Sequence, residues 1–490
     1  MESLLSEGGS TKEVKEREFK ESFVVSLLKK AIFTPILQTI FLNSLERRMY
    51  KDIVEKNPHC LRKVKLMKFN FARALLTCSV RNFKKGYISK EVANKLVHVF
   101  VQGNMVKGAK ELRTIDKFRQ DFGIWPPGFI VLSPTQRCNL RCVGCYASSK
   151  DTAPTLPFNV VERIANEAHD LLGNKFMVIS GGEPLMYQSQ GKTLFDIWEQ
   201  HPDMFFMFYT NGTLINEEVA ERLARLGNVS PAISLEGFEK ETDVRRGKGV
   251  FKKILEATNN LRRAGVPFGI SLTATRENIG TLLRDDFYDF IFLKLGATYI
   301  WLFQLMPIGK ARTVKELMLT PEERVELLKK WEYLLEKKRY CIADFWNSGV
   351  LADGCIAYAR RGGYFYIDWN GNIMPCVFVP YYEDNIIDLY KKGKSITDAL
   401  FSDLFKNGRK WQEEYGFAHQ SDPSNWLMPC SIRDHFKNFK KNILTKRAKP
   451  EDKDAALAIK SKEFEKFLDE FDKKLEKLTD PIWRHEYLKK

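Results

Sequence analysis

The sequence predicts an α/β fold built on a parallel sheet, either doubly wound or curved into a partial barrel. Three observations carry this prediction. Short apolar runs recur about every 25–40 residues, amphipathic stretches of helical period separate them, and a polar or glycine-rich segment follows nearly every run. The chemistry of such folds lies at the carboxyl ends of the strands, so these segments are candidate sites. The six runs are residues 129–132, 176–179, 205–209, 232–235, 268–272 and 300–305.

The region before this pattern is basic and is expected to be helical. Residues 1–120 hold 25 basic and 12 acidic side chains, in a chain whose net charge is +16. Thr34 and Pro35 read as a helix N-cap followed by proline at the first helical position, and further helical segments are expected at 61–80 and 90–101. Two interpretations stay open. The helices pack an apolar stripe on the rest of the protein, or an apolar face edged by lysines lies on an anionic membrane.

The number of cysteines and the first residues of the sequence indicate in which cellular compartment the protein is expected. Nine cysteines, an odd number, fit a disulfide framework poorly, and the first residues lack the basic start and continuous apolar stretch of a signal peptide. The best apolar stretch, 31–42, is too short to cross a membrane. We therefore expect a protein of the reducing cytoplasm, where clustered thiols more often bind metal than each other.

Cys138, Cys142 and Cys145 directly follow the first predicted strand. Three thiols this close together on one loop can converge on one metal centre. Zinc usually takes four ligands in paired C-x2-C units, and the sequence has no matching second pair. A 4Fe–4S cluster held by three thiolates instead leaves one iron open to a further ligand. Three unrelated loop cysteines are the alternative.

The motif C-x3-C-x2-C followed by Tyr146 resembles the signature of radical S-adenosylmethionine (SAM) enzymes. The resemblance implies a partial (β/α)6 barrel in which the open iron binds the amino and carboxylate groups of SAM. It also implies that an electron from the reduced cluster cleaves SAM to methionine and a 5′-deoxyadenosyl radical, which abstracts a hydrogen atom from the substrate. Reduced ferredoxin or flavodoxin is the electron donor that this chemistry implies.

The other strand ends are similar to segments of the same family. The resemblance implies that Glu183 accepts a hydrogen bond from the SAM ammonium, and that the glycines before it let the backbone approach the ligand. Arg246, or the adjacent Arg245, would pair with the SAM carboxylate. Glu236 stands where the family commonly has Asp beside the ribose. The residues expected at SAM are Tyr146, Gly181, Gly182, Glu183, Asn211, Ser234, Glu236, Arg246, Met306 and Pro307.

A second cysteine group, Cys355, Cys376 and Cys430, accompanies a predicted β-hairpin with an Asn-Gly turn at 370–371. This arrangement resembles the auxiliary-cluster extension called SPASM, or its shorter form called twitch. The sequence lacks the dense cysteine run of a full SPASM extension, so we expect one auxiliary iron–sulfur cluster. Candidates for its fourth ligand are Cys341, Asp434, His435 or the substrate. Zinc at these thiols and buried structural cysteines are the alternatives.

Four regions are therefore expected along the chain. A basic helical domain occupies 1–124, a partial barrel of the radical SAM type occupies 125–335, and an α+β auxiliary-cluster domain occupies 336–436. A charged helical arm at 437–490 completes the chain. The face that we expect to pack on the body is a stripe of Phe464, Phe467, Leu468, Phe471, Leu475 and Leu478.

The substrate is less constrained than the chemistry. The basic amino-terminal region, and a looser similarity of the last third to bacterial proteins implicated in joining fatty-acyl tails, favour a membrane lipid acyl chain. The reaction would be C–C bond formation or a related alkyl modification, with peripheral contact at the cytoplasmic face of an anionic membrane. A peptide- or protein-modifying maturase of the SPASM type is the alternative. RNA modification is a third hypothesis, but we recognise no RNA-binding module and do not expect a nucleic-acid partner. The sequence does not predict an oligomeric state.

Overall fold

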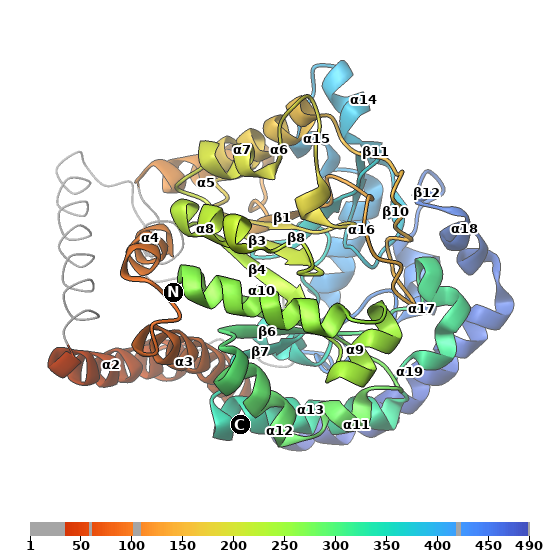
Figure 1. Ribbon diagram of the computed structural model, residues 1–490. Coiled ribbons are helices and arrows are strands. Elements are labelled where there is room, and N and C mark those ends of the chain that lie inside the picture. The colour runs from red at the N-terminus through yellow and green to blue at the C-terminus, as the bar shows by residue number, and fades with distance from the viewer. Residues whose placement is uncertain (1–34, 58–60, 101–108, 418–422, 489–490) are drawn as a thin grey trace.

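An open, mostly parallel sheet organises the computed structural model, which describes residues 35–57, 61–100, 109–417 and 423–488 (Figure 1). Within these residues the sheet has ten strands in the order β11-β9-β8-β1-β2-β3-β4-β5-β6-β7. The eight strands from β8 to β7 pair in parallel, whereas β9 and β11 pair antiparallel at one edge. The predicted α/β class is confirmed, and the sheet does not close into a barrel.

All six predicted strands are present at the expected positions, and the sheet contains strands beyond them. The six are β1 (Phe129–Leu132), β2 (Phe176–Ile179), β3 (Phe205–Thr210), β4 (Val229–Ser234), β5 (Gly269–Ala274) and β6 (Tyr299–Gln304). The others are β7 (Ile342–Asp344), β8 (Tyr364–Ile367), β9 (Asn372–Met374) and β11 (Asp384–Asn385). A separate ribbon joins β10 (Tyr381–Tyr382) to β12 (Lys449–Pro450).

The predicted hairpin exists as β8 and β9, with Tyr366 paired to Met374. It is not a separate module, because Phe129 to Leu132 of β1 pair in parallel with β8 and so join the hairpin to the main sheet. The strand β7 extends the same sheet at its other edge. The region boundaries at 125, 336 and 437 stay predictions.

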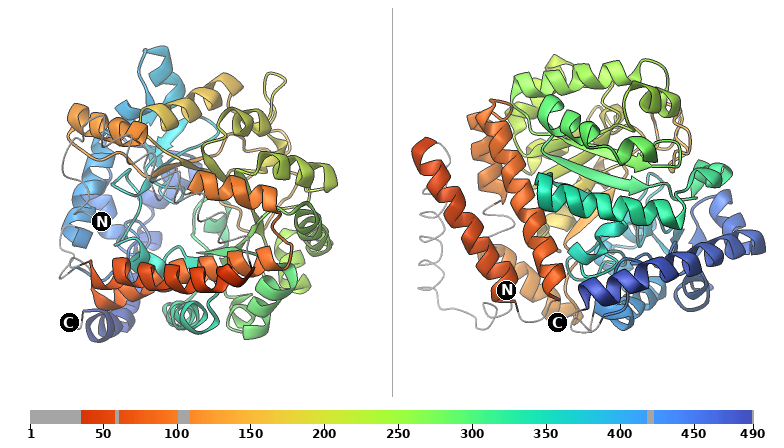
Figure 2. Two further views of the ribbon diagram at one scale, coloured as in Figure 1. Left: turned by 90° about the vertical axis from the view of Figure 1, so that its left-hand side faces the viewer. Right: turned by 90° about the horizontal axis from the view of Figure 1, so that it is seen from below.

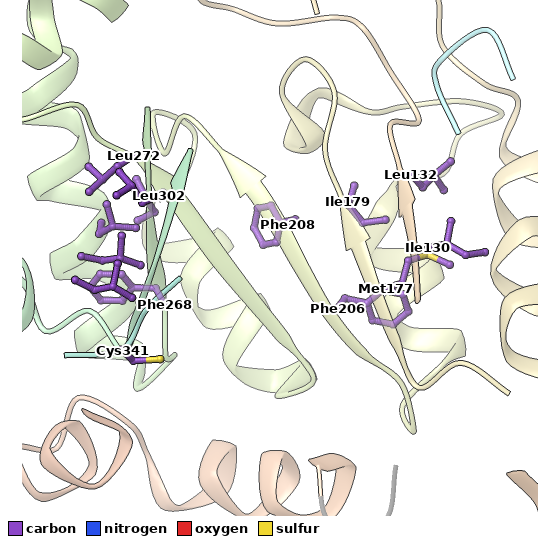
Figure 3. Packing of buried hydrophobic residues seen from close by; sticks show 14 of the residues in the cluster. Ile130, Leu132, Met177, Ile179, Phe206, Phe208, Phe268, Leu272, Leu302 and Cys341 are labelled. Carbon is purple, nitrogen blue, oxygen red and sulfur yellow. The ribbon is translucent and has the colours of Figure 1, made fainter. Parts of the chain in front are cut away.

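Helices cover one face of the sheet, and the last third of the chain packs against the other face. Alternate residues of each strand point to opposite faces. Figure 3 shows the helix-covered set, which packs into the larger hydrophobic core: Ile130, Leu132, Met177, Ile179, Phe206, Phe208, Phe268, Leu272, Leu302 and Cys341. The alternating set lies in a second cluster that also takes in the last third of the chain, and it includes Val131, Val178, Phe205 and Met207. Residues of this second set that lie near the carboxyl ends of their strands therefore face the site.

The helical elements follow the predicted alternation. The described α-helices are α2 (Pro35–Tyr50), α3 (Arg62–Lys84), α4 (Lys90–Phe100), α5 (Ala109–Phe122), α6 (Phe158–Asp170), α7 (Leu194–Gln200), α8 (Glu217–Leu226), α9 (Glu239–Arg246), α10 (Val250–Ala264), α11 (Ile279–Leu282), α12 (Asp285–Asp289), α13 (Pro321–Tyr333), α14 (Ile386–Lys391), α15 (Ile396–Ala399), α16 (Asp403–Gln412), α17 (Phe436–Asn438), α18 (Lys453–Lys460) and α19 (Lys462–Ile482).

The helix α3 (orange-red in Figure 2) extends from the segment just before Cys355, where Lys68 donates to Asp353, to the amino ends of β6 and β7. Asn82 donates to the carbonyl of Gly296, which precedes β6, and the Cys78 thiol donates to the carbonyl of Arg339, which precedes β7. The predicted helical amino-terminal region is thus present from Pro35 onward, while Thr34 lies outside the described residues. Among the residues that the structure places, we find no helix long and apolar enough to span a bilayer.

The carboxyl-terminal helix α19 is the predicted packing arm. Four residues of the predicted stripe are buried, Phe464, Leu468, Phe471 and Leu475, whereas Phe467 and Leu478 are partly buried. This face packs beside the sheet's carboxyl edge: Phe464 and Leu468 line a cavity of about 20 Å³ together with Met306 and Pro307. The arm therefore lies against two residues of the predicted SAM site.

Candidate functional site

The first cysteine group lies on the loop between β1 and α6, at the carboxyl edge of the sheet. The amide of Asn211, from the loop after β3, donates to Cys138 Sγ over 3.8 Å, and the N–H of Leu140 donates to the same sulfur over 3.4 Å. Burial raises the pKa of the Cys138 thiol to about 11, and the nearby Cys142 and Cys145 raise it further. The three thiols are therefore neighbours within electrostatic reach of one another.

In the described residues, the cysteine loop does not form a site for a single metal ion. In the described part of the chain, no three His, Cys, Asp or Glu side chains converge closely enough to share one ion. In a four-iron cluster each thiolate binds a different iron, so the ligands stand further apart than around one ion. The predicted four-iron cluster would take one thiolate of this loop on each of three irons.

Glu183 ties the ends of two strands together at the centre of the site. One carboxylate oxygen accepts from Thr210 Oγ1 (2.8 Å), and the other accepts from the N–H of Asn211 (2.8 Å). The side chain is fully buried, and burial raises its pKa to about 7 in spite of these donors. A carboxylate in this position can accept a further hydrogen bond from a ligand cation, because each of its oxygens has two lone pairs.

The absence of side chains at Gly181 and Gly182 lets another group pack closely against them. In the structure that group is the backbone of the segment that leads into the cysteines. A Cβ on Gly182 would lie 2.1 Å from the carbonyl oxygen of Arg137, and one on Gly181 would lie 2.5 Å from that of Thr135. These contacts join the loop after β2 to the segment that leads into the cysteines. The glycines therefore seat the cysteine loop, and their predicted contact with SAM stays a prediction.

Tyr146, next to the third cysteine, is anchored to the same loop after β2. Its hydroxyl oxygen accepts from the N–H of Gly181 (3.1 Å) and lies 2.8 Å from Ser180 Oγ. Burial raises the pKa of the phenol to about 12, so the hydroxyl stays protonated and uncharged near neutral pH. Tyr146 thus fixes the end of the cysteine motif against the glycine segment.

Glu236 holds both candidate arginines. Its Oε1 accepts from Arg245 Nη1 (2.6 Å) and from Arg246 Nε (2.9 Å), while its Oε2 accepts from the N–H of Thr273. Arg246 Nη1 donates to Cys142 Sγ over 3.9 Å. The carbonyl of Arg245 accepts from the N–H of Val143 in the cysteine loop (2.9 Å), and Arg245 Nε donates to the Val143 carbonyl (3.2 Å). Glu236 therefore binds both arginines, and its ion pair with Arg246 holds Nη1 of that arginine toward the cysteine loop.

The remaining predicted SAM residues lie at the same edge of the sheet. Asn211 follows β3, Ser234 is the last residue of β4, and Met306 and Pro307 follow β6. Ser234 is partly exposed at the strand end, and Met306 is buried against the carboxyl-terminal helices. The structure thus brings all ten predicted residues to one edge of the sheet, and their contacts with SAM stay predictions.

The second cysteine group also converges. Cys376 Sγ lies 2.9 Å from the Tyr364 hydroxyl and accepts from the N–H of Phe378 (3.4 Å). Burial raises the pKa of the Cys376 thiol, and the nearby Cys355 and Cys430 raise it further. Cys355, Cys376 and Cys430, which span 75 positions of the sequence, therefore lie near one another beside the hairpin.

The candidates for a fourth ligand are placed differently. Cys341 stands at the amino end of β7 near Cys78, at the opposite edge of the sheet from this group. Asp434 forms an ion pair with Arg324 (2.6 Å), and His435 Nε2 lies 2.9 Å from the carbonyl oxygen of Met428. Cys341 is thus not near the group, and the other two side chains already have protein partners.

An aromatic wall that the sequence did not reveal lies in the buried cluster that also holds the second cysteine group. Tyr209 is the last inward-facing residue of β3 and contacts Phe303 edge-to-face at 5.6 Å. Phe303 in turn contacts Phe345 (5.5 Å), and Phe345 contacts Phe378 (5.4 Å). The alternation of residues 205–210 is the signal that could have found Tyr209, because it places this phenol on the same face as Phe205 and Met207.

Comparison with known proteins gives consistent similarities. A family model described as the radical SAM superfamily matches residues 132–284. Mycofactocin maturase MftC of Mycobacterium ulcerans is 32% identical over 314 residues, which cover 60% of this chain and 78% of that protein. The AdoMet-dependent heme synthase of Methanosarcina barkeri is 26% identical over 343 residues, 64% of this chain and 89% of that one. Among solved structures, Streptococcus suis SuiB bound to S-adenosylmethionine matches with a TM-score of 0.49 and 16% identity, over 67% of this chain and 78% of SuiB.

Proposed function

The chain belongs to the radical SAM superfamily, and we propose from this premise that it removes a hydrogen atom from a side chain of a peptide or protein precursor. One observation carries the chemistry. Three neighbouring thiols at the carboxyl edge of a parallel sheet stand beside a buried carboxylate, Glu183, and a guanidinium, Arg246. These are the charges needed to bind the ammonium and carboxylate groups of SAM.

The chain's own residues bind and orient in this proposal. Cys138, Cys142 and Cys145 would hold a 4Fe–4S cluster, which supplies the electron that cleaves SAM. Glu183 would accept from the SAM ammonium, and Arg246 would donate to its carboxylate through the nitrogen that Glu236 leaves free. The aromatic wall of Tyr209, Phe303, Phe345 and Phe378 limits water at the position where a substrate would enter.

We assign a single auxiliary cluster to Cys355, Cys376 and Cys430. The donors around these sulfurs support this assignment, because hydrogen bonds stabilise charge on a thiolate. The N–H groups of Ile432 and Arg433 lower the pKa of Cys430, and the N–H of Phe378 points at Cys376, although burial is the larger effect in both cases. Zinc is the competing occupant, and the iron content of the chain distinguishes the two.

A peptide or protein substrate is supported by the similarity to maturases, which covers most of the length of that relative. The lipid hypothesis depended on free positive charge in the amino-terminal helices. In the structure Lys63 pairs with Glu332 (2.9 Å) and Glu486, and Lys68 pairs with Asp353 (2.7 Å). These lysines bind the body of the protein, which favours the packing interpretation for α3 over docking on an anionic surface.

A deuterium-transfer assay tests the proposal. The anaerobically reconstituted chain, with reduced flavodoxin or ferredoxin as electron donor, is given deuterated precursor peptides in one arm and deuterated phospholipid vesicles in the other. We expect deuterium in 5′-deoxyadenosine only in the peptide arm, and the Cys142→Ala variant as control should give none in either. Transfer from lipid alone would instead restore the acyl-chain hypothesis.

A further inference from the structure

A fully buried arginine without a hydrogen-bond partner lies beside the second cysteine group. Arg433 is 0% exposed, and its Nε, Nη1 and Nη2 all lack a hydrogen-bond partner among the described residues. Its guanidinium lies over the Trp346 ring at 5.0 Å and over the Phe471 ring at 5.4 Å. Ring faces attract a cation, but they satisfy none of its N–H donors.

None of the nearby carboxylates forms an ion pair with Arg433 among the described residues, although Asp434 and Asp344 lie close enough to attract its charge. Asp434 is paired with Arg324 through both oxygens, at 2.6 and 3.3 Å. Asp344 accepts from Gln304 and Asn347. Asp472 has an unpartnered buried oxygen and forms no ion pair with Arg433 in the described chain, and burial raises its pKa to about 8. Asp472 is therefore largely protonated at neutral pH and cannot supply a full negative charge.

An isolated charge in a protein interior is costly by several kcal/mol, so a buried guanidinium normally has an anion next to it. The position of Arg433 indicates where that anion belongs. Arg433 follows Cys430 by three residues, and its own N–H points at the Cys430 thiol. Trp346, the platform beneath the guanidinium, contacts Phe378 at 4.9 Å, and the Phe378 N–H donates to Cys376 Sγ.

We infer that Arg433 is the counter-ion of the auxiliary iron–sulfur cluster and raises its reduction potential. This inference rests on the proposed binding of that cluster by Cys355, Cys376 and Cys430. A thiolate-bound cluster carries net negative charge, and its reduced form carries one more negative charge than its oxidised form. A fixed cation nearby stabilises the reduced form more strongly, and net charge around a cluster is a known determinant of its potential.

The test measures potentials of the reconstituted full-length chain by redox titration followed by electron paramagnetic resonance. Arg433→Met removes the charge, whereas Arg433→Lys keeps it. Arg409→Met is the matched control. Arg409 is a partly buried cation of the same region, but it donates to the carbonyls of Tyr358 and Leu400, and no thiol contributes to the shift of its pKa. We expect the auxiliary potential to become more negative in Arg433→Met, to stay near the wild-type value in Arg433→Lys, and to be unchanged in Arg409→Met. The potential of the first cluster should not move in any variant.

Each outcome decides the inference. Loss of the auxiliary cluster in Arg433→Met, from about eight irons per chain to about four, with retention in Arg433→Lys, would also support a counter-ion role. An unchanged auxiliary potential in Arg433→Met would overturn it. A more positive auxiliary potential in Asp472→Asn would also overturn it, because it would show that Asp472 is ionised and is the partner of Arg433. If Arg433→Met does not fold, Arg433→Gln provides the same neutral comparison. Wild-type chain with only about four irons would instead refute the auxiliary cluster itself, and the inference with it.

Discussion

Glu236 and Arg246 form a buried ion pair at the carboxyl edge of the sheet, with Arg246 Nε 2.9 Å from Glu236 Oε1. The carboxylate is 1% exposed and the guanidinium 11%. The pair holds the arginine so that Nη1 faces Cys142, at 3.9 Å from its sulfur. In the family that this chain resembles, the residue at the position of Glu236 is expected beside the ribose of SAM. In this chain Glu236 instead orients Arg246, which we assign to the SAM carboxylate.

Replacing Glu236 with Gln should therefore disable SAM cleavage without touching a cysteine. The substitution leaves two buried guanidinium groups without their carboxylate, and breaking a buried pair costs about 3–5 kcal/mol of folding free energy. We expect 5′-deoxyadenosine formation to fall at least about 10-fold, as for other residues that orient a ligand. Glu217→Gln is the control, because its partner Arg263 and the carboxylate are both well exposed, and it should change stability by less than about 1 kcal/mol. Equal activity of the two variants would contradict this role.

Glu183 should make SAM binding depend on pH. Burial raises its pKa to about 7, and only the ionised carboxylate can accept from the SAM ammonium without donating a proton of its own. Affinity should therefore rise as the pH increases through 7 and level off above it, by up to about tenfold per pH unit below the pKa. Calorimetry of SAM binding between pH 6 and 8 measures this. The dependence should disappear in Glu183→Gln, and a wild-type affinity that is flat over this range would refute the assignment.

Gly182→Ala should displace the cysteine loop. Its Cβ would lie 2.1 Å from the Arg137 carbonyl oxygen, a backbone atom that cannot rotate away. Overpacking of this kind costs about 1–3 kcal/mol. Gly280→Ala is the control, since a Cβ there meets nothing within 4 Å. We expect a reduced iron content from the first cluster in Gly182→Ala and a normal content in Gly280→Ala. Full iron occupancy in both variants would show that the loop tolerates the shift.

Strand positions were predicted best where the strands are buried on both faces of the sheet. Such strands are continuous apolar runs, and all six predicted runs appear as parallel strands. β7 was missed because it ends in Asp344, a residue that reads as polar loop. In the fold this carboxylate is buried and accepts from the N–H groups of Trp346 and Asn347. These backbone donors take the place of the water molecules that would solvate an aspartate in an exposed loop.

The long-range pairings could not be predicted. The hairpin at 364–376 was expected from its turn, but its parallel pairing with β1 joins segments more than 200 residues apart and leaves no local pattern. The burial of Arg433 could not be predicted for the same reason, because it depends on contacts with Trp346 and with Phe471 of α19, which are distant in the sequence. Motif resemblance located the candidate residues, whereas only the fold showed that Glu236 binds arginines.

Substituting the second cysteine group should separate the two clusters. In Cys376→Ala the chain should lose about half of its iron, while SAM cleavage without substrate continues, because Cys138, Cys142 and Cys145 are untouched. Hydrogen abstraction from the true substrate is the step that we expect to be lost. Iron and zinc analysis of the purified variant and wild type checks this. Zinc in place of iron in the wild type would show that the second group is a zinc site.

Formation of 5′-deoxyadenosine by the Cys142→Ala variant tests the central claim most directly. Cys142 lies on the loop with Cys138 and Cys145, and its sulfur is the one nearest to Arg246. After anaerobic reconstitution and reduction, the wild type should convert SAM to 5′-deoxyadenosine and methionine, whereas the variant should form neither above background. Persistent 5′-deoxyadenosine formation by the variant would contradict the assignment of this loop to SAM cleavage.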